Sequence, residues 1–542
     1  MKKICKITGN EFEITDKDLE FYKKVWVPTP TLSPEERQRR RMTWRNDRVF
    51  YKRTCDFSGK KIISMYDADT EFPVYNQDEW WSDKWDALSY GQDFDFERSF
   101  FEQFWELLSK VPRISLINKL PENAEYCNFA LGNKNSYLLF TSWENEDCAY
   151  LNRAWNCNNA LDGINVKDCD LCYEVSDSSN CFKSLYITNC TDCSDCMYSE
   201  NLINCSYCFG CSNLTNKQYH VGNKLVAKED YQEKVNELLS DKKLLTEFLE
   251  KQKNKQFHKD IQGTQNQNCS GNFLSYSKDS DFCFDASHLE DCKYCSNITE
   301  SKNVYDTDND DHSELVYESI GSEQNYLHLF NDISWFNKHL LYSSLCFHSE
   351  NSFGCIGLKN KEFCILNKQY SKEEYNMLLP KIIAHMRNTW EWGEFFPLSL
   401  SPFSYNESVA QDFYPLTSES VEQFGGRWKI KDTSAQYHWA RKVLPENIND
   451  VSDDIVKEVL TCDCCEKNYR IIGLELNLYR KLWISIPNNC FNCRYDQRLL
   501  KKRNRKLYER DCDGCSNNIL SIYPKSSWKT VYCEGCYEHE ID

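Results

Sequence analysis

Two internal duplications, one nested inside the other, constrain the fold of this chain more than any other feature. Residues 5–79 align with residues 462–536 without a gap. Between them, residues 120–231 align in the same way with residues 264–375. Repeats of this regularity reflect repeated structural units, so the chain has the plan A–B–B′–A′.

Within the inner repeats, cysteines recur at short fixed steps. Cys148 and Cys157 are nine residues apart, whereas Cys190, Cys193 and Cys196 follow one another at three-residue steps. The residues between the cysteines are mostly Asn, Ser, Asp, Tyr and Phe, which favour short strands and tight turns over helices. This pattern predicts two β-solenoid lobes in which small buried cysteines stack from one turn to the next.

These cysteines also include several C-x-x-C pairs, so a string of metal-binding knuckles is the alternative interpretation. The second repeat replaces Cys169 with Ser313 and Cys172 with Val316 without losing the pattern. Metal ligands do not tolerate such replacements, whereas core positions of a solenoid do. We therefore favour packing as the role of the inner cysteines.

Helical segments are expected to cover the ends of the two lobes. Residues 228–256 carry apolar side chains at helical spacing, and Ser371 with Glu374 forms a capping box that starts the corresponding second helix. A further helix is predicted over residues 97–110. Residues 394–446 have weak periodicity and are expected to form an extended connection that lies on the protein.

The strongest chemical signal is a set of four C-x-x-C pairs in the second outer repeat. Each such turn supplies two thiolates, and four thiolates satisfy the tetrahedral preference of zinc. We predict two structural zinc ions in sequential four-cysteine sites, with cross-braced ligation as the alternative. No coordination position would stay open for catalysis. The predicted ligands are Cys462, Cys465, Cys490, Cys493, Cys512, Cys515, Cys533 and Cys536.

The first outer repeat lacks most of these ligands. Other residues occupy six of the eight corresponding positions, although Cys5 and Cys55 are present. We expect this module to hold no metal and to be stabilised by apolar packing instead. The side chains expected to provide this packing are Phe12, Ile14, Tyr22 and Trp26.

Both outer repeats carry a concentrated basic segment, although the net charge of the chain is −18. Residues 37–53 hold eight Arg or Lys against one Asp, and residues 494–510 hold eight against two acids. Such segments can bind a polyanion locally, so nucleic acid, with RNA favoured, is a candidate partner. The alternatives are a solvated basic face and internal pairing with the acidic remainder of the chain. The candidate nucleic-acid-binding residues are Arg37, Arg39, Arg40, Arg41, Arg45, Arg48, Arg53, Lys501, Lys502, Arg503, Arg505, Lys506 and Arg510.

The segment after the second cysteine pair is expected to be helical through about Arg510, which places a positive helix N-terminus beside thiolates. A cysteine-pair turn followed by a basic helix resembles a treble-clef or zinc-ribbon finger. The whole chain is also similar to a group of large bacterial proteins of uncharacterised activity, which carry zinc-ribbon-like segments at both ends and a Cys-rich repeat region between them. This resemblance implies an architecture but no activity. It rests on residues 80–86, residues 94–96 and the two FGC blocks that begin at Phe209 and Phe353.

No recognised enzyme signature is present, since the chain has no P-loop and no G-x-G-x-x-G, G-x-S-x-G or H-E-x-x-H motif. Four aspartates between positions 306 and 311 are interpreted as a polar loop rather than as a calcium site. Three tryptophans between positions 80 and 85 are interpreted as core rather than as a platform for a sugar or a base.

The cellular compartment can be predicted from the cysteines and from the N-terminus. Thirty cysteines without an apolar signal segment indicate a reducing compartment, so we predict a cytoplasmic location, with a disulfide-rich exported protein as the alternative. No run of about 18 apolar residues occurs, so no membrane span is expected.

Together these patterns predict a mainly β protein with some α-helix. The expected domains are residues 1–80 (degenerate zinc-ribbon-like module), 81–119 (helical connector), 120–257 and 258–393 (solenoid lobes with capping helices), 394–460 (extended connector) and 461–542 (zinc-binding module). The predicted function is a non-enzymatic, zinc-stabilised scaffold that binds nucleic acid through its basic helices. A scaffold that binds proteins or surfaces through the solenoid face, and a carbohydrate-active β-helix enzyme, are the alternatives.

Overall fold

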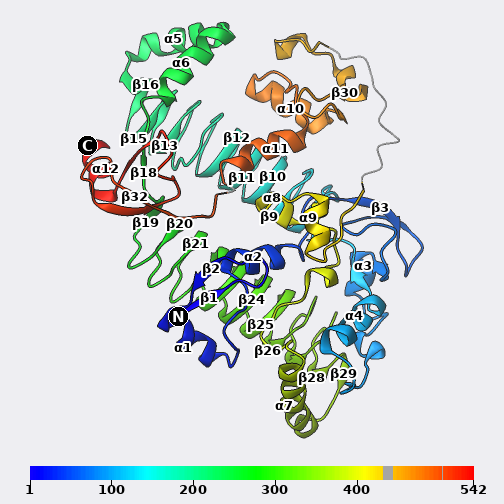
Figure 1. Cartoon of the computed structure of the whole chain (residues 1–542). Coiled ribbons are helices and arrows are strands. Elements are labelled where there is room, and N and C mark those ends of the chain that lie inside the picture. Colours follow the sequence, from blue (N-terminus) through cyan, green and yellow to red (C-terminus); the bar gives the residue numbers. More distant parts are fainter. Residues whose placement is uncertain (431–442, 503, 542) are drawn as a thin grey trace.

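The computed structural model describes residues 1–430, 443–502 and 504–541, and its centre is formed by two ladders of mostly parallel strands (Figure 1). The first ladder consists of β7 (Asn118–Lys119), β8 (Asn128–Leu131), β9 (Phe140–Trp143), β10 (Ala149–Trp155), β11 (Asn158–Lys167), β12 (Asp170–Ser179), β13 (Glu200–Ile203), β14 (Ser206–Phe209), β15 (Ser212–Thr215), β16 (Gln218–Val221) and β17 (Lys224–Leu225). The second ladder consists of β19 (Gly263–Thr264), β20 (Gly271–Ser275), β21 (Cys283–Ser287), β22 (Ser296–Thr299), β23 (Lys302–Asp311), β24 (Glu314–Glu323), β25 (Tyr326–Trp335), β26 (Lys338–Leu341), β27 (Glu350–Phe353), β28 (Glu362–Ile365) and β29 (Lys368–Gln369). Only the last strand of each ladder pairs antiparallel.

Equivalent positions in neighbouring strands are twelve residues apart along the chain, except between β19 and β20, where the step is eleven. Leu161, for example, pairs with Ala149 on one side and with Tyr173 on the other. Every third residue along the ladders has a positive φ, such as 56° at Asp192 and 51° at Asp195. Asn and Asp adopt this conformation more readily than other residues with a side chain, which explains their abundance in the repeats. The three- and nine-residue cysteine steps both fit this twelve-residue repeat.

The cysteines of the ladders point into the interior. Cys148 and Cys355 have no exposed surface, and the other ladder cysteines, except the partly exposed Cys269, are also buried. Their thiols hydrogen-bond to backbone carbonyl groups, as when Cys172 donates to Asp170 at 3.3 Å and to Cys181 at 3.4 Å. All of these cysteines are free thiols, so small apolar side chains and weak S–H donors fill the ladder cores.

Helices lie at opposite ends of the two ladders (Figure 1). The segment predicted as one helix over 228–256 is instead two, α5 (Lys228–Ser240) and α6 (Lys242–Lys253), because Asp241 ends the first and caps the second. The second ladder ends in α7 (Lys372–Asn388), which starts at the predicted capping box of Ser371 and Glu374. In the described part of the chain, no helix has both the length and the apolar composition to cross a bilayer.

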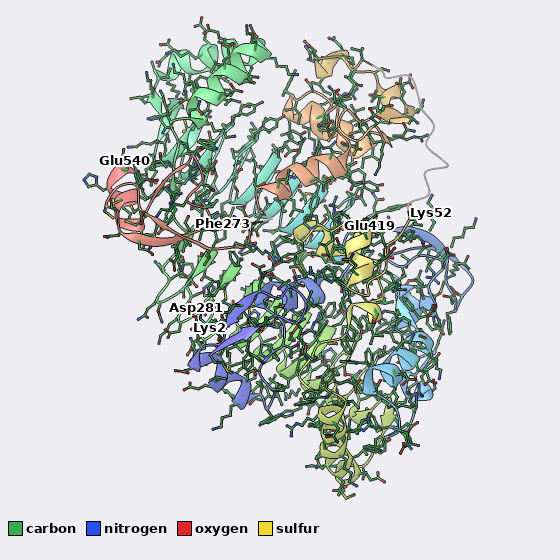
Figure 2. All side chains as sticks on the ribbon, viewed as in Figure 1. Lys2, Lys52, Phe273, Asp281, Glu419 and Glu540 are labelled. Atoms are coloured by element: carbon green, nitrogen blue, oxygen red, sulfur yellow. The ribbon has the colours of Figure 1, made fainter. Side chains whose placement is uncertain are left out.

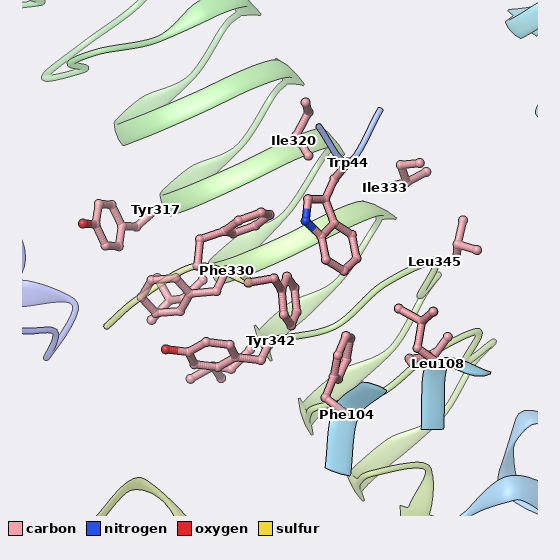
Figure 3. Close-up of a cluster of buried hydrophobic side chains, with 14 of the residues drawn as sticks. Trp44, Phe104, Leu108, Tyr317, Ile320, Phe330, Ile333, Tyr342 and Leu345 are labelled. Carbon is pink, nitrogen blue, oxygen red and sulfur yellow. The ribbon is translucent and has the colours of Figure 1, made fainter. Parts of the chain in front are cut away.

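A large aromatic core joins the second ladder to α4 (Phe100–Lys110) and to the connection that follows α7 (Figure 3). Phe104 stacks on Phe396 at 4.4 Å between ring centroids, and Trp44 lies 4.7 Å from Phe396. Trp80 is fully buried in the same core, which confirms the packing interpretation of that residue. The described part of the connection is not simply extended, since it contains η2 (Leu398–Leu400), η3 (Tyr405–Glu407), α8 (Val409–Phe413) and α9 (Ser418–Gln423). Residues 431–442 of the predicted connection lie outside the described residues.

The two outer repeats have the same order of elements. The N-terminal module contains β1 (Lys2–Ile4), β2 (Glu11–Glu13), α1 (Asp16–Lys24), α2 (Pro34–Met42), β3 (Tyr51–Thr54), β4 (Lys61–Ser64), β5 (Val74–Tyr75) and α3 (Gln77–Trp81). The C-terminal module contains β30 (Leu460–Thr461), β31 (Asn468–Tyr469), α10 (Gly473–Leu482), α11 (Phe491–Leu500), β32 (Tyr508–Asp511), β33 (Asn518–Ser521), β34 (Thr530–Tyr532) and α12 (Glu534–Ile541).

Each module packs a helix on the ladder that is farther from it in the sequence and pairs its last strand with the segment that leads into the other ladder. Helix α2 packs on β23 and β24 of the second ladder, whereas α11 packs on β11 of the first (Figure 1). The last strand of each module pairs with the segment that leads into the other ladder: β5 pairs with β6 (Arg113–Ile114), and β34 pairs with β18 (Phe257–Lys259). The two ends of the chain therefore hold the two ladders together.

Candidate metal centres and the basic helices

The first candidate metal centre contains Cys462, Cys465, Cys490 and Cys493, whose sulfur atoms all lie within 4.8 Å of one another. The first pair lies in the turn between β30 and β31, and the second pair lies at the N-terminus of α11. The turn and the start of the helix both direct backbone N–H groups toward the sulfur atoms, which brings the two pairs together. The N–H of Cys490, for example, donates to Sγ of Cys462 at 3.2 Å.

The second candidate centre contains Cys512, Cys515, Cys533 and Cys536, which also lie within 4.8 Å of one another. The β32–β33 hairpin supplies the first pair, and the start of α12 supplies the second. Its Cys515 is exposed, so this group lies closer to the surface than the first one. Each centre is formed by two cysteine pairs that follow one another in the sequence. This grouping agrees with the predicted sequential ligation and not with the cross-braced alternative.

In each group the surroundings favour the thiolate of the first cysteine, whereas the pKa of both cysteines of the second pair is raised. Burial raises the pKa of Cys462, but the backbone N–H groups of Cys490, Cys465 and Cys464 favour the thiolate and lower its pKa to about 7 overall. Burial also raises the pKa of Cys512, but hydrogen bonds from backbone N–H groups lower it to about 6 overall. Four soft donors at this spacing fit a tetrahedral metal ion and leave no open coordination position. The chain therefore has two sites that could hold metal ions.

In the N-terminal module, hydroxyl, carboxylate and amide groups take the places of the missing ligands. Burial raises the pKa of Cys5, but Thr8, which stands where the C-terminal module has Cys465, donates to its sulfur and helps to lower the pKa to about 7. Cys55 accepts from the N–H of Asn76 at 3.2 Å. Of the four predicted packing residues, Phe12, Ile14 and Tyr22 are buried, but Trp26 is 58% exposed and does not belong to this core.

The basic side chains of α2 are buried against carboxylates of the second ladder. Arg37 forms an ion pair with Asp306 at 2.9 Å, and Arg41 forms one with Glu318 at 3.0 Å. None of these four side chains is more than 1% exposed. Burying an unpaired charge is costly, so these pairs are required for α2 to dock. Asp306 lies on β23 and not in the predicted polar loop.

The C-terminal module repeats this arrangement on the first ladder. Arg494, the counterpart of Arg37, lies 2.9 Å from Asp162. Arg498, the counterpart of Arg41, lies 2.6 Å from Glu174. Asp162 and Glu174 are the counterparts of Asp306 and Glu318, so both duplications preserve the same ion pairs.

The helix that carries these arginines is shorter than predicted. α11 ends at Leu500 instead of continuing to about Arg510, which lies on β32. Beyond the helix, Lys502 contacts Asp177 of the first ladder and Asp285 of the second, the latter at 2.7 Å. Lys502 therefore bridges the two ladders.

The other predicted nucleic-acid-binding residues are placed as follows. Arg39 pairs with Glu36, Arg40 with Glu318 and Glu394, Arg45 with Asp47 and Thr141, Arg48 with Asn492, Arg53 with Asp56, Arg505 with Asp285, Lys506 with Glu35 and Arg510 with Asp513. Lys501 is exposed, and Arg503 lies outside the described residues. The two basic segments are thus mostly matched by internal carboxylates and do not form one open basic surface.

The carboxylate partners were not identified from the sequence. Their signal is an Asp followed twelve residues later by a Glu at matching positions of the two inner repeats, Asp162 with Glu174 and Asp306 with Glu318, although Asp311 with Glu323 has the same spacing in the second repeat alone. A twelve-residue step places the two carboxylates on adjacent strands, where one arginine helix can reach both.

No family model matches the chain, and no curated protein matches it either. The fold and the cysteine groups define a duplicated protein of mixed α-helices and strands with two candidate metal centres near its C-terminus.

Proposed function

We propose that this protein is a non-enzymatic scaffold, in which two zinc ions and buried arginine–carboxylate pairs fasten the terminal modules across two β-solenoid lobes. The twelve-residue register, the buried cysteine stacks and the helices at the ladder ends support the solenoid assignment. One observation carries the scaffold role: the pair of Arg37 with Asp306 recurs as the pair of Arg494 with Asp162.

Zinc is the metal that best fits the two cysteine groups. All eight donors are thiols, which favour soft or borderline ions over calcium or magnesium. Because the cysteines of the chain are all free thiols, metal ligation explains the paired cysteines better than disulfides do. Four-cysteine zinc sites contribute to folding and do not activate water.

The carboxylate rows give little support to the alternative of a carbohydrate-active enzyme. Asp162 with Glu174, and Asp306 with Glu318, lie on adjacent strands as a catalytic pair would. Arginines cover all four, however, and a glycosidase needs carboxyl groups that can reach its substrate.

Nucleic-acid binding is a second proposal, restricted to the basic side chains that stay at the surface. Lys501 and Lys506 are exposed beside the end of α11, and Arg48 is half-buried nearby. Phosphate contacts require cations that reach solvent, which Arg37 and Arg41 do not. Binding of a protein partner through the outer face of a ladder is compatible with the same scaffold role.

Hydrogen exchange before and after removal of metal with EDTA tests the scaffold role. The expected result is faster exchange in the C-terminal module and in β11 and β12, on which that module docks. Strands β23 and β24 provide the matched control, because α2 of the module that lacks the cysteine groups docks on them. Unchanged exchange in β11 and β12, or an equal loss of protection in β23 and β24, would overturn the proposal.

A further inference from the structure

A cavity of about 840 Å³ lies between the two ladders. Strands β8–β11 of the first ladder and β20–β25 of the second supply most of its walls, and Phe273, labelled in Figure 2, lines it from β20. A cavity of this size accommodates a ligand as large as a mononucleotide.

The two ladders line this cavity with different side chains, although they are copies of each other. Trp143, Arg153 and Trp155 of the first ladder correspond to Ser287, Asn297 and Thr299 of the second. All six residues line the cavity. The second copy folds with small polar side chains at these positions, so the fold itself does not require the tryptophans or the arginine.

The two tryptophans form one aromatic stack. Trp143 and Trp155 are neighbours in the register of β9 and β10. Their rings stack with centroids 5.4 Å apart and an angle of 7° between the planes. Indole faces of this kind bind the faces of bases or of sugar rings.

Arg153 lies beside this stack and forms no ion pair within the part of the chain that the structure describes, although the charge of Asp285, which pairs with Lys502, acts on it from farther away. Its guanidinium carbon lies 5.7 Å from the ring centre of Trp155, and its Nη1 donates to Asn309 of the other ladder at 3.1 Å. Its Nε is buried and has no hydrogen-bond partner, and no carboxylate lies within 4.0 Å of it among the described residues. The neighbouring Arg45, by contrast, pairs with Asp47.

A partly buried arginine without an anion is costly, and burial also lowers the pKa of Arg153 to about 10. The guanidinium presents donors in a geometry that matches phosphate and carboxylate oxygens. An anionic ligand in the cavity would supply the missing counter-charge.

We propose that the cavity binds an organic phosphate of mononucleotide size, with its phosphate on Arg153 and its ring on Trp143 and Trp155. The carboxylates of Asp311 and Glu323 line the cavity from β23 and β24 of the second ladder and would repel the phosphate there. They can accept hydrogen bonds from hydroxyl or amino groups at the other end of the ligand. This site is separate from the metal centres and goes beyond the scaffold role.

Calorimetric titration of the full-length, metal-loaded protein tests the proposal, with AMP, GMP, CMP, UMP and glucose 6-phosphate as probes. At least one probe is expected to bind and to quench tryptophan fluorescence, whereas adenosine and inorganic phosphate alone bind far more weakly. Preference for the nucleotides would identify a planar base as the ring, and preference for glucose 6-phosphate would identify a sugar. If no probe binds at millimolar concentration, the proposal is overturned.

Two variants locate the site by installing the side chains of the other ladder. Arg153→Asn and Trp155→Thr are each expected to weaken binding at least tenfold. A loss of this size is about what the removal of one charge-assisted hydrogen bond or one stacked ring costs in binding free energy. Thermal unfolding should show that both variants stay folded, since the second ladder tolerates the same residues. Unchanged affinity in both variants would place the ligand elsewhere and overturn the assignment.

Discussion

The Nε atom of Arg494 lies 2.9 Å from the Oδ2 atom of Asp162, although the two residues are 332 positions apart in the chain. The equivalent ion pair in the other half of the molecule joins Nη2 of Arg37 to Oδ2 of Asp306, also at 2.9 Å. The first module docks on the second ladder and the last module docks on the first, so each half of the duplication depends on the other half for its fold.

Removal of one partner of these pairs should be strongly destabilising. Arg494→Met leaves the buried Glu475 without its cation and leaves Asp162 with Arg498 alone. The expected cost is about 3–5 kcal/mol in the free energy of unfolding of that half, measured by chemical denaturation.

The matched control for this variant is Lys2→Met, which removes the exposed pair with Glu11 and should leave stability unchanged. The double variant Arg494→Met with Glu475→Gln should recover part of the loss, because Glu475 no longer carries an unpaired buried charge and Asp162 keeps Arg498. A single Arg494 variant as stable as the Lys2 control would contradict the docking role.

Asp310 predicts a specific dependence of stability on pH. Burial raises its pKa to about 7, although hydrogen bonds from Ser313 and Ser301 oppose the shift. Since an unfolded Asp has a pKa of about 3.9, the folded protein binds the proton more tightly. Its stabilising contribution is therefore complete below about pH 4 and is lost as the pH rises through about 7.

The variant Asp310→Asn removes this dependence. It should be more stable than the wild type at pH 8 by up to about 4 kcal/mol, from the size of the pKa shift, and the difference should shrink toward pH 4. Thermal unfolding of both proteins across this range provides the measurement. Parallel pH profiles would show that Asp310 does not titrate in this way.

Thiol labelling separates the packed cysteines from the metal-binding ones. Cys148 and Cys355 are buried, and burial raises the pKa of both thiols, so an alkylating agent should modify them only on unfolding. The exposed Cys464 should react at once. Cys515 should become reactive when EDTA removes metal, as mass spectrometry of labelled peptides would show. Rapid labelling of Cys148 in the native protein would exclude the packed core.

Polyanion binding should depend only on the exposed lysines. Lys501→Ala with Lys506→Ala is expected to leave the unfolding temperature unchanged and to weaken any salt-dependent binding of RNA or DNA. Lys502→Ala is expected to lower the unfolding temperature, because Lys502 bridges Asp177 and Asp285. If the exposed double variant binds RNA as tightly as the wild type at every salt concentration, nucleic-acid binding through this segment is excluded.

The sequence predicted the features that depend on local or repeated patterns. The order of the repeats, both cysteine groups and the capping box at Ser371 follow from spacing alone. The end of α11 at Leu500 could not be predicted from the sequence, because helix propensity is a weak preference that tertiary contacts override. Lys502 must reach carboxylates on both ladders, which a continued helix would prevent.

The burial of the arginines could not be predicted either, for a different reason. Charge composition shows that acids are in excess but does not show which acid meets which base. The partners of Arg37 and Arg494 are hundreds of residues away, and the crossed docking of the modules decides the pairing. Internal pairing was one of the alternatives that the sequence left open, and the geometry favours it.

The metal content of the purified protein tests the central claim most directly. The account predicts about two zinc ions per chain, one for each four-thiolate site. Cys490→Ser should release one of them, whereas Cys55→Ser, at the position that corresponds to Cys512, should release none. A wild-type protein that holds no zinc, or about four ions so that the ladder cysteines also bind metal, would contradict the account.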